Sequence, residues 1–450
     1  MRRPAQSILL LLLLLLALPA TALLCALGLP GAPVARAAEV RALTIGTSGQ
    51  GRPISAVRFG SGPLKLVVVG DTHGAPEANT YTLTNQLIDH FRANPGDVPP
   101  GVRLYLIPTL NPDGLALGTR FNASGVDLNR NMNTDLDACP ENDWRTTVQG
   151  AYGLISDTGG PYPDSEPESR VIRGFLLDAN GAIFLHSNAG LVFPAFCEHQ
   201  PSIRLGEVYA AGAGYLYSRY WPKYMITGGM HDWAASLGIA AITPELVTGD
   251  DSEFGQNLAG LRAVLAEAAD LLPPLDDHVE AGVPVPALIW RYWKSRGGVA
   301  AFGAPLAPAA RDGPVTRQVF ERAVLELRPD RADTPDLVRP APLGRIAAAG
   351  QRLAPVPRPP DAAWFPETGH TLRGPFRDYW ERGGGLEVFG FPLTEEVTAA
   401  GMDGARRLTQ FFERAMLTYD EAAGVRREPL GRAALLRERL APPSSRYQLR

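Results

Sequence analysis

Residues 64–70 read Leu-Lys-Leu-Val-Val-Val-Gly, and they run directly into Asp71-Thr72-His73-Gly74-Ala75-Pro76-Glu77. A short apolar run that ends in glycine is typical of a strand buried on both faces of a sheet. Proline favours the first turn of a helix, so Pro76 predicts that a helix begins here, with Glu77 next in that turn. Strand, polar turn and helix in this order predict one unit of an α/β fold.

Similar segments recur further along the chain. Apolar runs predict strands at residues 102–107, 182–185 and 239–242, and apolar residues at helical spacing predict helices at 80–91 and 256–272. Strands that alternate with helices predict an α/β fold with a mixed, mostly parallel sheet and helices on both faces. Ligands of such sheets bind beyond the carboxyl ends of the strands, and the polar residues considered below fall at those ends.

The composition is that of a globular protein with no nucleic-acid partner. Hydrophobic residues make up 45% of the 450 residues, charged residues make up 20%, and the net charge is −4. No basic stripe dominates any segment, so we expect no nucleic acid to bind. The length allows two or three domains.

The N-terminus predicts export. Arg2 and Arg3 precede an apolar run from Ile8 to Leu29, and Ala35-Arg36-Ala37-Ala38 then supplies a small-x-small cleavage pattern. The run is also long enough for a retained membrane anchor, although Pro19, Gly28 and Pro30 disfavour that alternative. Both interpretations place the rest of the chain outside the cytoplasm, either secreted or at the cell surface.

Two cysteines remain after the predicted signal, Cys139 and Cys197. In an exported protein they can form a disulfide bond. The alternative is a pair of free, buried thiols.

An internal repeat begins after Pro273-Pro274. Tyr292-Trp293, Phe302-Gly303 and Pro342-Leu343-Gly344-Arg345 recur 87 residues later, and Phe320-Glu321-Arg322-Ala323 recurs 92 residues later as Phe412-Glu413-Arg414-Ala415. We therefore expect a signal or anchor at 1–38, an α/β domain at 39–273, a repeat module at 274–346, and a linker with a second repeat module at 347–450.

Three polar side chains at strand ends have the chemistry of zinc ligands. His73 and Glu77 follow the strand at 64–70, and His186 follows the strand at 182–185. Two imidazoles and one carboxylate leave a fourth position for water, as in catalytic zinc sites. The alternative for a single histidine at a strand end is a hydrogen-bonded structural role.

Two other parts of the sequence carry charged residues that could take part in binding or catalysis. One part comprises Arg120 and the segment Gly125-Val126-Asp127-Leu128-Asn129-Arg130-Asn131. It is either a solvated loop or an anion site, and the second is possible because the planar guanidinium of arginine matches a carboxylate. Glu245 closes the strand at 239–242, where it is either solvated or a general base for a water molecule on a metal.

Residues from about 43 to 272 resemble a zinc carboxypeptidase of the carboxypeptidase A/B type. The resemblance rests on motifs in the family's order, of which the Gly125–Asn131 segment is the most specific. The motifs are His-Gly-x-x-Glu at 73–77, Asn-Pro-Asp-Gly at 111–114, Arg120, the segment 125–131, Leu-His-Ser at 185–187, Tyr224 to Trp233, and Thr-Pro-Glu-Leu at 243–246.

The resemblance implies a role for each matching residue. His73, Glu77 and His186 would hold one Zn²⁺ ion, and Glu245 would take a proton from the zinc-bound water and pass it to the leaving amine. Arg120 would stabilise the oxyanion. Tyr224 would close over the substrate. Asn129 and Arg130 would bind the free C-terminal carboxylate of the substrate, and His231 would lie at the base of the specificity pocket, unless it bonds to a neighbouring loop instead.

The chain departs from the family pattern in two places. The family usually has two residues between its first histidine and its glutamate, whereas Gly74, Ala75 and Pro76 make three here. A strand-to-helix loop can absorb such an insertion. The domain, at roughly 230 residues, is also near the short end for the family.

The C-terminal repeats resemble the Phe-Gly-x-Pro (LGFP-like) repeats found beside bacterial cell-wall hydrolases. Their aromatic side chains could stack on sugars of a wall polymer, or they could form the core of each repeat. These side chains are Trp290, Tyr292, Trp293, Phe376, Tyr379 and Trp380.

The resemblance implies an exported metallocarboxypeptidase that acts on peptides with a free C-terminus. One alternative is a carboxypeptidase or amidase of the same fold that acts on peptidoglycan stem peptides. Another is a non-catalytic wall-binding protein on a peptidase scaffold.

Overall fold

The computed structural model describes residues 40–150, 153–351 and 354–440, and the signal or anchor expected at 1–38 lies outside them. Within these ranges no helix combines the length and the apolar character that a membrane crossing requires.

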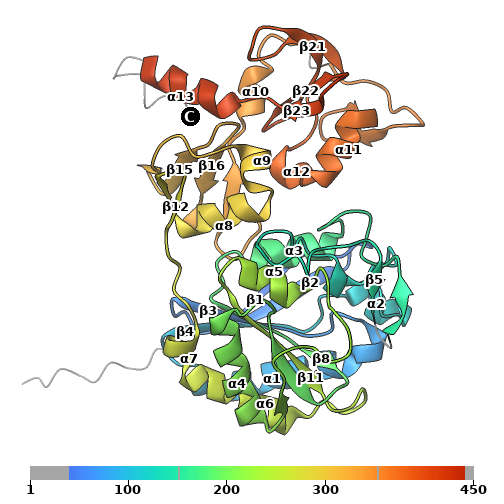
Figure 1. Cartoon of the computed structure of the whole chain (residues 1–450), viewed down its shortest axis with the longest axis vertical. Coiled ribbons are helices and arrows are strands. Elements are labelled where there is room, and N and C mark those ends of the chain that lie inside the picture. The colour runs from blue at the N-terminus through green and yellow to red at the C-terminus, as the bar shows by residue number, and fades with distance from the viewer. Residues whose placement is uncertain (1–39, 151–152, 352–353, 441–450) are drawn as a thin grey trace, which may run out of the picture. The chain divides into compact units, whose positions relative to one another are not determined.

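One nine-stranded sheet organises the first part of the described chain (Figure 1). Its central strands are parallel, and antiparallel pairs lie toward both edges, so the sheet is mixed and mostly parallel, as predicted. In spatial order the strands are β1 (Val40–Thr47), β2 (Pro53–Phe59), β4 (Val102–Ile107), β3 (Leu64–Val69), β7 (Gly181–Phe184), β11 (Ala240–Leu246), β9 (Leu191–Pro194) and β10 (Leu216–Tyr217), with β8 (His186–Ser187) paired to β11.

Alternate residues of the strands point to opposite sides of this sheet, and the residues on both sides are apolar. Helices cover both faces and bury these residues. Leu66 and Val68 of β3 pack toward α1 (Ala78–Ala93), α4 (Gln200–Ala213) and α6 (Phe254–Ala266). Val67 and Val69 pack toward α3 (Pro167–Phe175) and α5 (Met230–Ser236). Shorter elements are α2 (Pro112–Leu117), α7 (Ala268–Leu271), β5 (Val148–Gln149) and β6 (Ile155–Ser156).

The predicted strands are present, with two differences that concern the site. The strand predicted at 239–242 continues to Leu246, so Glu245 lies within β11 and not after it. The run predicted at 182–185 ends at Phe184, and His186 begins the separate strand β8. The hairpin β1–β2 and strand β9 were not predicted, because Val40–Thr47 and Leu191–Pro194 lack a clear alternating pattern.

Cys139 and Cys197 form a disulfide bond, which confirms the first of the two alternatives. Their Cα atoms lie 6.1 Å apart. The bond joins the loop that follows Asn129-Arg130 to the loop that follows β9.

The two repeats have the same order of elements, each a hairpin, two helices, a four-stranded antiparallel sheet and a final helix. Repeat 1 comprises β12 (His278–Glu280), β13 (Val283–Val285), α8 (Ala287–Ser295), α9 (Gly298–Phe302), β14 (Ala310–Asp312), β15 (Val315–Val319), β16 (Val324–Leu327), β17 (Val338–Pro340) and α10 (Leu343–Ala347). Repeat 2 comprises β18 (Ala363–Phe365), β19 (His370–Leu372), α11 (Gly374–Arg382), α12 (Gly385–Val388), β20 (Val397–Ala400), β21 (Arg406–Phe411), β22 (Met416–Asp420), β23 (Gly424–Arg427) and α13 (Leu430–Leu440).

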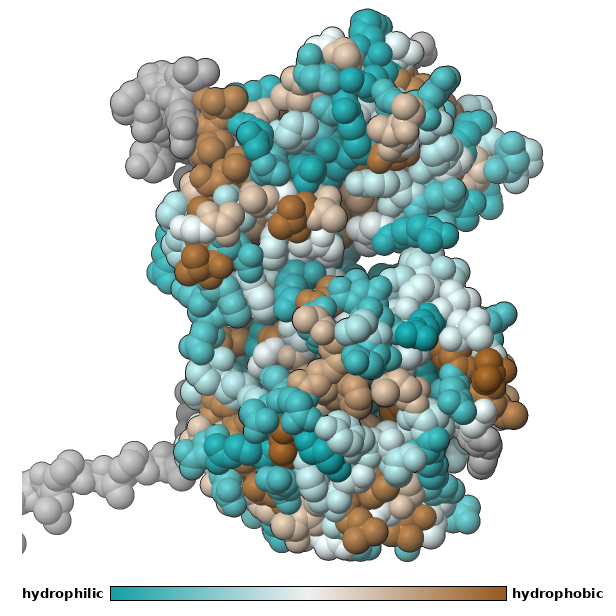
Figure 2. Space-filling model, in the orientation of Figure 1, coloured by the Kyte–Doolittle hydropathy of each residue, from teal (hydrophilic) through white to brown (hydrophobic). Residues whose placement is uncertain are grey.

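Most of the repeats' aromatic side chains belong to their cores. Trp290, Tyr292, Trp293 and Phe376 are buried, and Tyr379 and Trp380 are partly exposed. On the face shown in Figure 2, apolar residues lie scattered among polar ones. The four buried rings therefore stabilise the repeats and offer no stacking surface to a sugar.

Repeat 1 makes hydrogen bonds to the end of α5. The Arg291 side chain of α8 donates to the carbonyls of Leu237 and Gly238, and the Lys294 ammonium donates to the carbonyl of Ser236 at 2.9 Å. Cations at a helix C-terminus complement its partial negative charge. Since α5 also carries His231, repeat 1 supports a helix of the candidate site.

Candidate functional site

A tight turn after β3 places His73 beside Glu77. Gly74 has a φ of 57° and lies so close to Thr119 and Gly114 that a Cβ atom would meet the Thr119 carbonyl at 2.3 Å, so only glycine fits. A 3-10 turn then spans Ala75–Glu77 before α1 begins at Ala78. This extra turn absorbs the third residue between the two predicted ligands, and it puts Pro76 and Glu77 before α1, not within its first turn.

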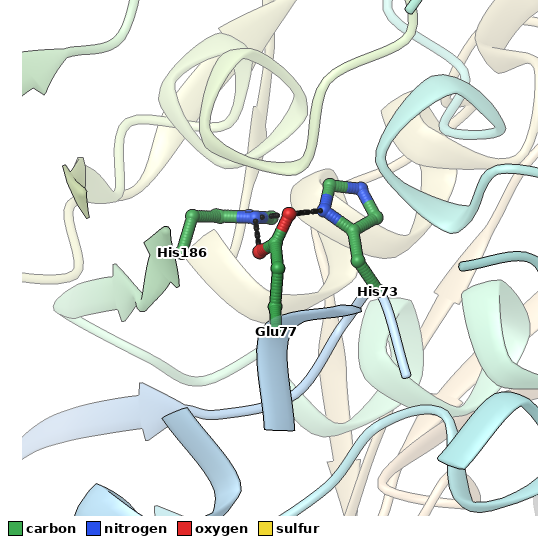
Figure 3. Close-up of side chains that lie close together, drawn as sticks. All are labelled: His73, Glu77 and His186. Atoms are coloured by element: carbon green, nitrogen blue, oxygen red, sulfur yellow. Dashed lines mark hydrogen bonds and ion pairs between the residues drawn. The ribbon is translucent and has the colours of Figure 1, made fainter. Parts of the chain in front are cut away.

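His186 completes a cluster of three buried side chains (Figure 3). Glu77 lies between the two histidines, with Oε1 2.7 Å from His73 Nδ1 and Oε2 2.9 Å from His186 Nδ1. The two Nδ1 atoms are 3.0 Å apart. Ligands of a tetrahedral zinc site, with bonds of about 2.0–2.2 Å, lie roughly 3.3 Å from one another. The three donor atoms therefore fit one zinc ion.

Asp127 lies behind the ring of His73, a contact that the sequence analysis did not predict. Its Oδ1 lies 3.0 Å from His73 Nε2, and Arg120 Nη2 lies 2.9 Å from the same nitrogen. A carboxylate behind a histidine ligand fixes the ring and increases its basicity. Burial would raise the pKa of Asp127, but Arg120 and His73 more than offset it and hold that pKa well below its usual range. The one sequence feature that pointed to Asp127 was its position in the Gly125–Asn131 motif.

Arg120 lies against the same cluster. Its guanidinium donates to Glu77 Oε1 and to Asp127 Oδ2, both at 3.1 Å. Burial would lower the pKa of Arg120, but the two carboxylates raise it above its usual value, so the side chain is a fixed cation beside the ligands.

Asn129 and Arg130 are buried on the 3-10 turn Leu128–Arg130. The Asn129 amide nitrogen lies 3.4 Å from His186 Nε2, and its Oδ1 accepts from the backbone N–H of Met230. Arg130 donates to the carbonyls of Asn129 and Gln149, and its guanidinium lies 5.7 Å from the centre of the Tyr224 ring. Of the two predicted anion-binding residues, Asn129 therefore lies beside His186, and Arg130 lies beside Tyr224.

Glu245 is aligned with His186 across paired strands. The two residues are register partners of the parallel pair β8–β11. Burial raises the pKa of Glu245 to about 7, and the neighbouring carboxylate of Glu77 adds to this effect, while His186 and Arg120 oppose it. A carboxylate with a pKa near neutrality is suited to accept and return a proton.

A cavity of about 430 Å³ is lined by β9, by α5 and by the loop before α5. Tyr224 lines it, and burial raises the pKa of its phenol. His231 lines it too, with Nδ1 3.3 Å from the Thr243 hydroxyl, and burial lowers the pKa of this imidazole. The wall between them is aromatic, from Phe193 and Trp221. The cavity thus combines an aromatic wall with polar and charged lining residues, and His231 both lines the cavity and bonds to a neighbouring residue.

Comparisons with known proteins agree with this geometry. A family model described as zinc carboxypeptidase matches residues 35–262. Murein peptide amidase A of Escherichia coli (strain K12) is 27% identical over 183 residues, which are 40% of this chain and 69% of that protein. Carboxypeptidase B of Astacus astacus is 27% identical over 165 residues, 31% of this chain and 51% of that protein.

A solved structure, murein-tripeptide amidase MpaA from Escherichia coli O157, covers 53% of this chain and 99% of its own, with 20% identity and a TM-score of 0.38. The matched segments span 11% to 69% of the lengths of the curated relatives.

Zinc is the metal of the matched family, and the cluster of His73, Glu77 and His186 supplies ligands of the kind that zinc prefers. Because the family model covers 228 of the 450 residues, this chain belongs to the zinc carboxypeptidase family.

Proposed function

We propose that this protein is an exported zinc metallocarboxypeptidase that hydrolyses the C-terminal amide bond of peptides. The observation that carries the proposal is the convergence of His73, Glu77 and His186, with Glu245 in register beside them. A structural cluster of histidines would need no second buried carboxylate of raised pKa.

The proton chemistry belongs to Glu245. Zinc held by the three ligands would polarise the substrate carbonyl and lower the pKa of a water molecule. Glu245 takes a proton from the attacking water and then delivers it to the leaving amine, because its pKa allows both states near neutral pH.

Fixed cations position the substrate and its developing charge. Arg120 stabilises the oxyanion of the tetrahedral intermediate with its guanidinium donors. Arg130 and Asn129 bind the free C-terminal carboxylate, which a planar guanidinium suits. Tyr224, 5.7 Å from Arg130, closes over the bound terminal residue.

Two observations support export. The signal pattern in residues 1–38 directs the chain out of the cytoplasm. The Cys139–Cys197 disulfide is of a kind that persists in oxidising compartments.

The proposal is tested with a pair of peptides that differ only at the C-terminus, one a free acid and the other an amide. We expect release of the terminal residue from the acid, loss of this activity with a chelator, and recovery with zinc. Equal cleavage of both peptides would exclude a carboxylate clamp and hence a carboxypeptidase.

A second candidate keeps the site and changes the substrate to peptidoglycan stem peptides. It is favoured by the similarity to murein peptide amidase A, since the matched segment covers 69% of that protein. Purified muropeptides and ordinary peptides of equal length separate the two candidates. A kcat/KM higher for muropeptides by tenfold or more would favour the second.

The third candidate, a non-catalytic wall-binding protein, predicts a chain that does not take up zinc. Measuring the metal content of purified protein after dialysis against zinc tests it directly. One zinc ion per chain would exclude a non-catalytic protein that has lost its metal site.

A further inference from the structure

Each repeat ends in a helix that begins with Leu-Gly-Arg, and this motif has no part in the catalytic site. The helices are α10 at Leu343–Ala347 and α13 at Leu430–Leu440. In each repeat a turn with the sequence Phe-Glu-Arg-Ala, at 320–323 and 412–415, precedes the third strand of the four-stranded sheet.

The helix of repeat 1 packs on the turn of repeat 2. The backbone N–H of Arg345 donates to the carbonyl of Glu413 at 3.1 Å, and the Arg345 guanidinium pairs with the Glu413 carboxylate. Ala348 lies in one buried cluster with Phe411 and Met416 of repeat 2. Helix α10 therefore completes the core of the neighbouring repeat.

The helix of repeat 2 makes the reciprocal contacts with repeat 1. The backbone N–H of Arg432 donates to the carbonyl of Glu321 at 3.0 Å, and the two side chains form an ion pair. Helix α13 contacts β15 of repeat 1, and it also contacts α10. Leu430 at the start of α13 stays in the buried cluster of repeat 2, so the exchange is reciprocal in its backbone hydrogen bonds and ion pairs.

The glycines of the two motifs show how closely the exchanged helices approach. A Cβ atom on Gly344 would lie 1.9 Å from the Phe412 carbonyl, and one on Gly431 would lie 1.9 Å from the Phe320 carbonyl. Both clashes are with backbone of the other repeat. Both positions, 87 residues apart, therefore require glycine because the backbone of the other repeat leaves no room for a side chain.

A buried cation lies where the two repeats meet. The Arg427 guanidinium is 5.0 Å from the ring centre of Phe302 in repeat 1 and 5.4 Å from that of Phe389 in repeat 2. The two phenylalanines are the equivalent residues of the repeated Phe-Gly motif. A desolvated cation between two rings is stabilising, so this contact joins the two halves.

We infer that the two repeats are one folding unit, made by reciprocal exchange of their final helices, and that each Phe-Glu-Arg-Ala turn is a docking site for a Leu-Gly-Arg helix supplied by the other repeat of the same chain. The inference does not depend on the proposed catalytic activity.

Cysteine pairs in the full-length protein test this arrangement. Arg345→Cys with Glu413→Cys, and Arg432→Cys with Glu321→Cys, join the repeats. Arg345→Cys with Glu321→Cys, and Arg432→Cys with Glu413→Cys, are the matched controls within one repeat. The native disulfide is common to all four variants.

After mild oxidation, peptide mapping by mass spectrometry under non-reducing conditions locates the new disulfide, and gel filtration separates monomer from dimer. We expect the first two pairs to link within monomers and the two control pairs to remain reduced. Linkage of the control pairs, or linkage of the first two pairs only between chains, would overturn the inference.

A second measurement does not depend on the cysteine variants. Gly344→Ala changes repeat 1, yet it should accelerate amide hydrogen exchange at residues 412–416 of repeat 2. Gly431→Ala should do so at residues 320–324. Gly255→Ala, where no atom lies within 4 Å of the added Cβ, is the control. If hydrogen exchange became faster only in the turn of the substituted repeat, the helices would not be exchanged between the repeats.

Discussion

Glu77 and Glu387 are both carboxylates held between two nitrogen-bearing side chains, but their neighbours differ in kind. Glu77 lies between two histidines, which can offer lone pairs, and it accepts one hydrogen bond from the cation of Arg120. Glu387 lies between Arg173 of α3 and Arg296 of repeat 1, which stay charged. Burial would raise the pKa of Glu387, but the two arginines lower it to about 2.

The difference separates a metal site from a structural ion pair. The cluster around Glu387 is balanced by permanent charges and holds α3 and both repeats together. The cluster around Glu77 presents three donor atoms to one point and has a second carboxylate, Glu245, whose pKa is raised. A carboxylate between two histidines can share a metal ion with them, whereas a carboxylate between two arginines only stabilises the fold.

The largest expected effect tests the chemical side of this comparison. Glu245→Gln keeps the shape of the side chain but removes the base, so kcat should fall by about 10²–10⁴-fold. Zinc content and melting temperature should remain those of the parent protein. Steady-state kinetics on a free-acid peptide measures the loss, and turnover within a factor of three of the parent would rule out Glu245 as the base.

The next effect tests the structural side. Glu387→Gln leaves the Arg296 guanidinium without a carboxylate, and unfolding should become easier by roughly 2 kcal/mol, less than the full cost of breaking a buried pair because Glu387 is partly exposed. Denaturant unfolding measures it. Glu381→Gln, which breaks an exposed pair with Arg377, is the control and should cost about 1 kcal/mol or less. Equal losses in both variants would mean that the Glu387 cluster does not stabilise the fold.

A smaller effect is expected at Asp127. Asp127→Asn removes the carboxylate charge beside His73 Nε2, so zinc affinity should fall by about 10–100-fold. Competition with a fluorescent chelator measures the dissociation constant, and the exposed Asp89→Asn is the control. An unchanged affinity would show that Asp127 does not orient the ligand.

The smallest effect is a pH dependence. Glu245 acts as a base only when it is ionised, so kcat/KM should decline as the pH falls through its pKa. That pKa should lie between the ordinary 4.5 and about 7, because burial raises it and a bound cation lowers it. A pH–rate profile from pH 4 to 8 locates the acid limb. A rate that rises on acidification would require a group with the opposite role.

Much of the sheet follows from local sequence, because β3, β4, β7 and β11 are runs of apolar residues that any buried parallel strand needs. The predicted ligands also converge, because the carboxyl ends of parallel strands meet at one edge. The route from His73 to Glu77 was harder, since only the close approach of Thr119 explains why Gly74 and a 3-10 turn accommodate the extra residue.

Other features depend on contacts that no local pattern encodes. The role of Asp127 requires His73 to lie beside it, 54 residues away along the chain. Sequence alone left the pairing of Cys139 with Cys197 undecided. The repeated motifs would look the same in the sequence whether each final helix packed on its own repeat or on the other one. The repeat pattern therefore predicted two modules but not the exchange of their helices.

The hydrogen bonds from Arg291 and Lys294 to the end of α5 bear on where this enzyme can be cut for expression. A fragment that stops at Pro273 retains every proposed catalytic residue but loses the donors on the Ser236 and Leu237 carbonyls. The helix that carries His231 would then end in carbonyls that face water and no longer two cations. The minimal unit for biochemistry is therefore longer than the segment that the family model matches.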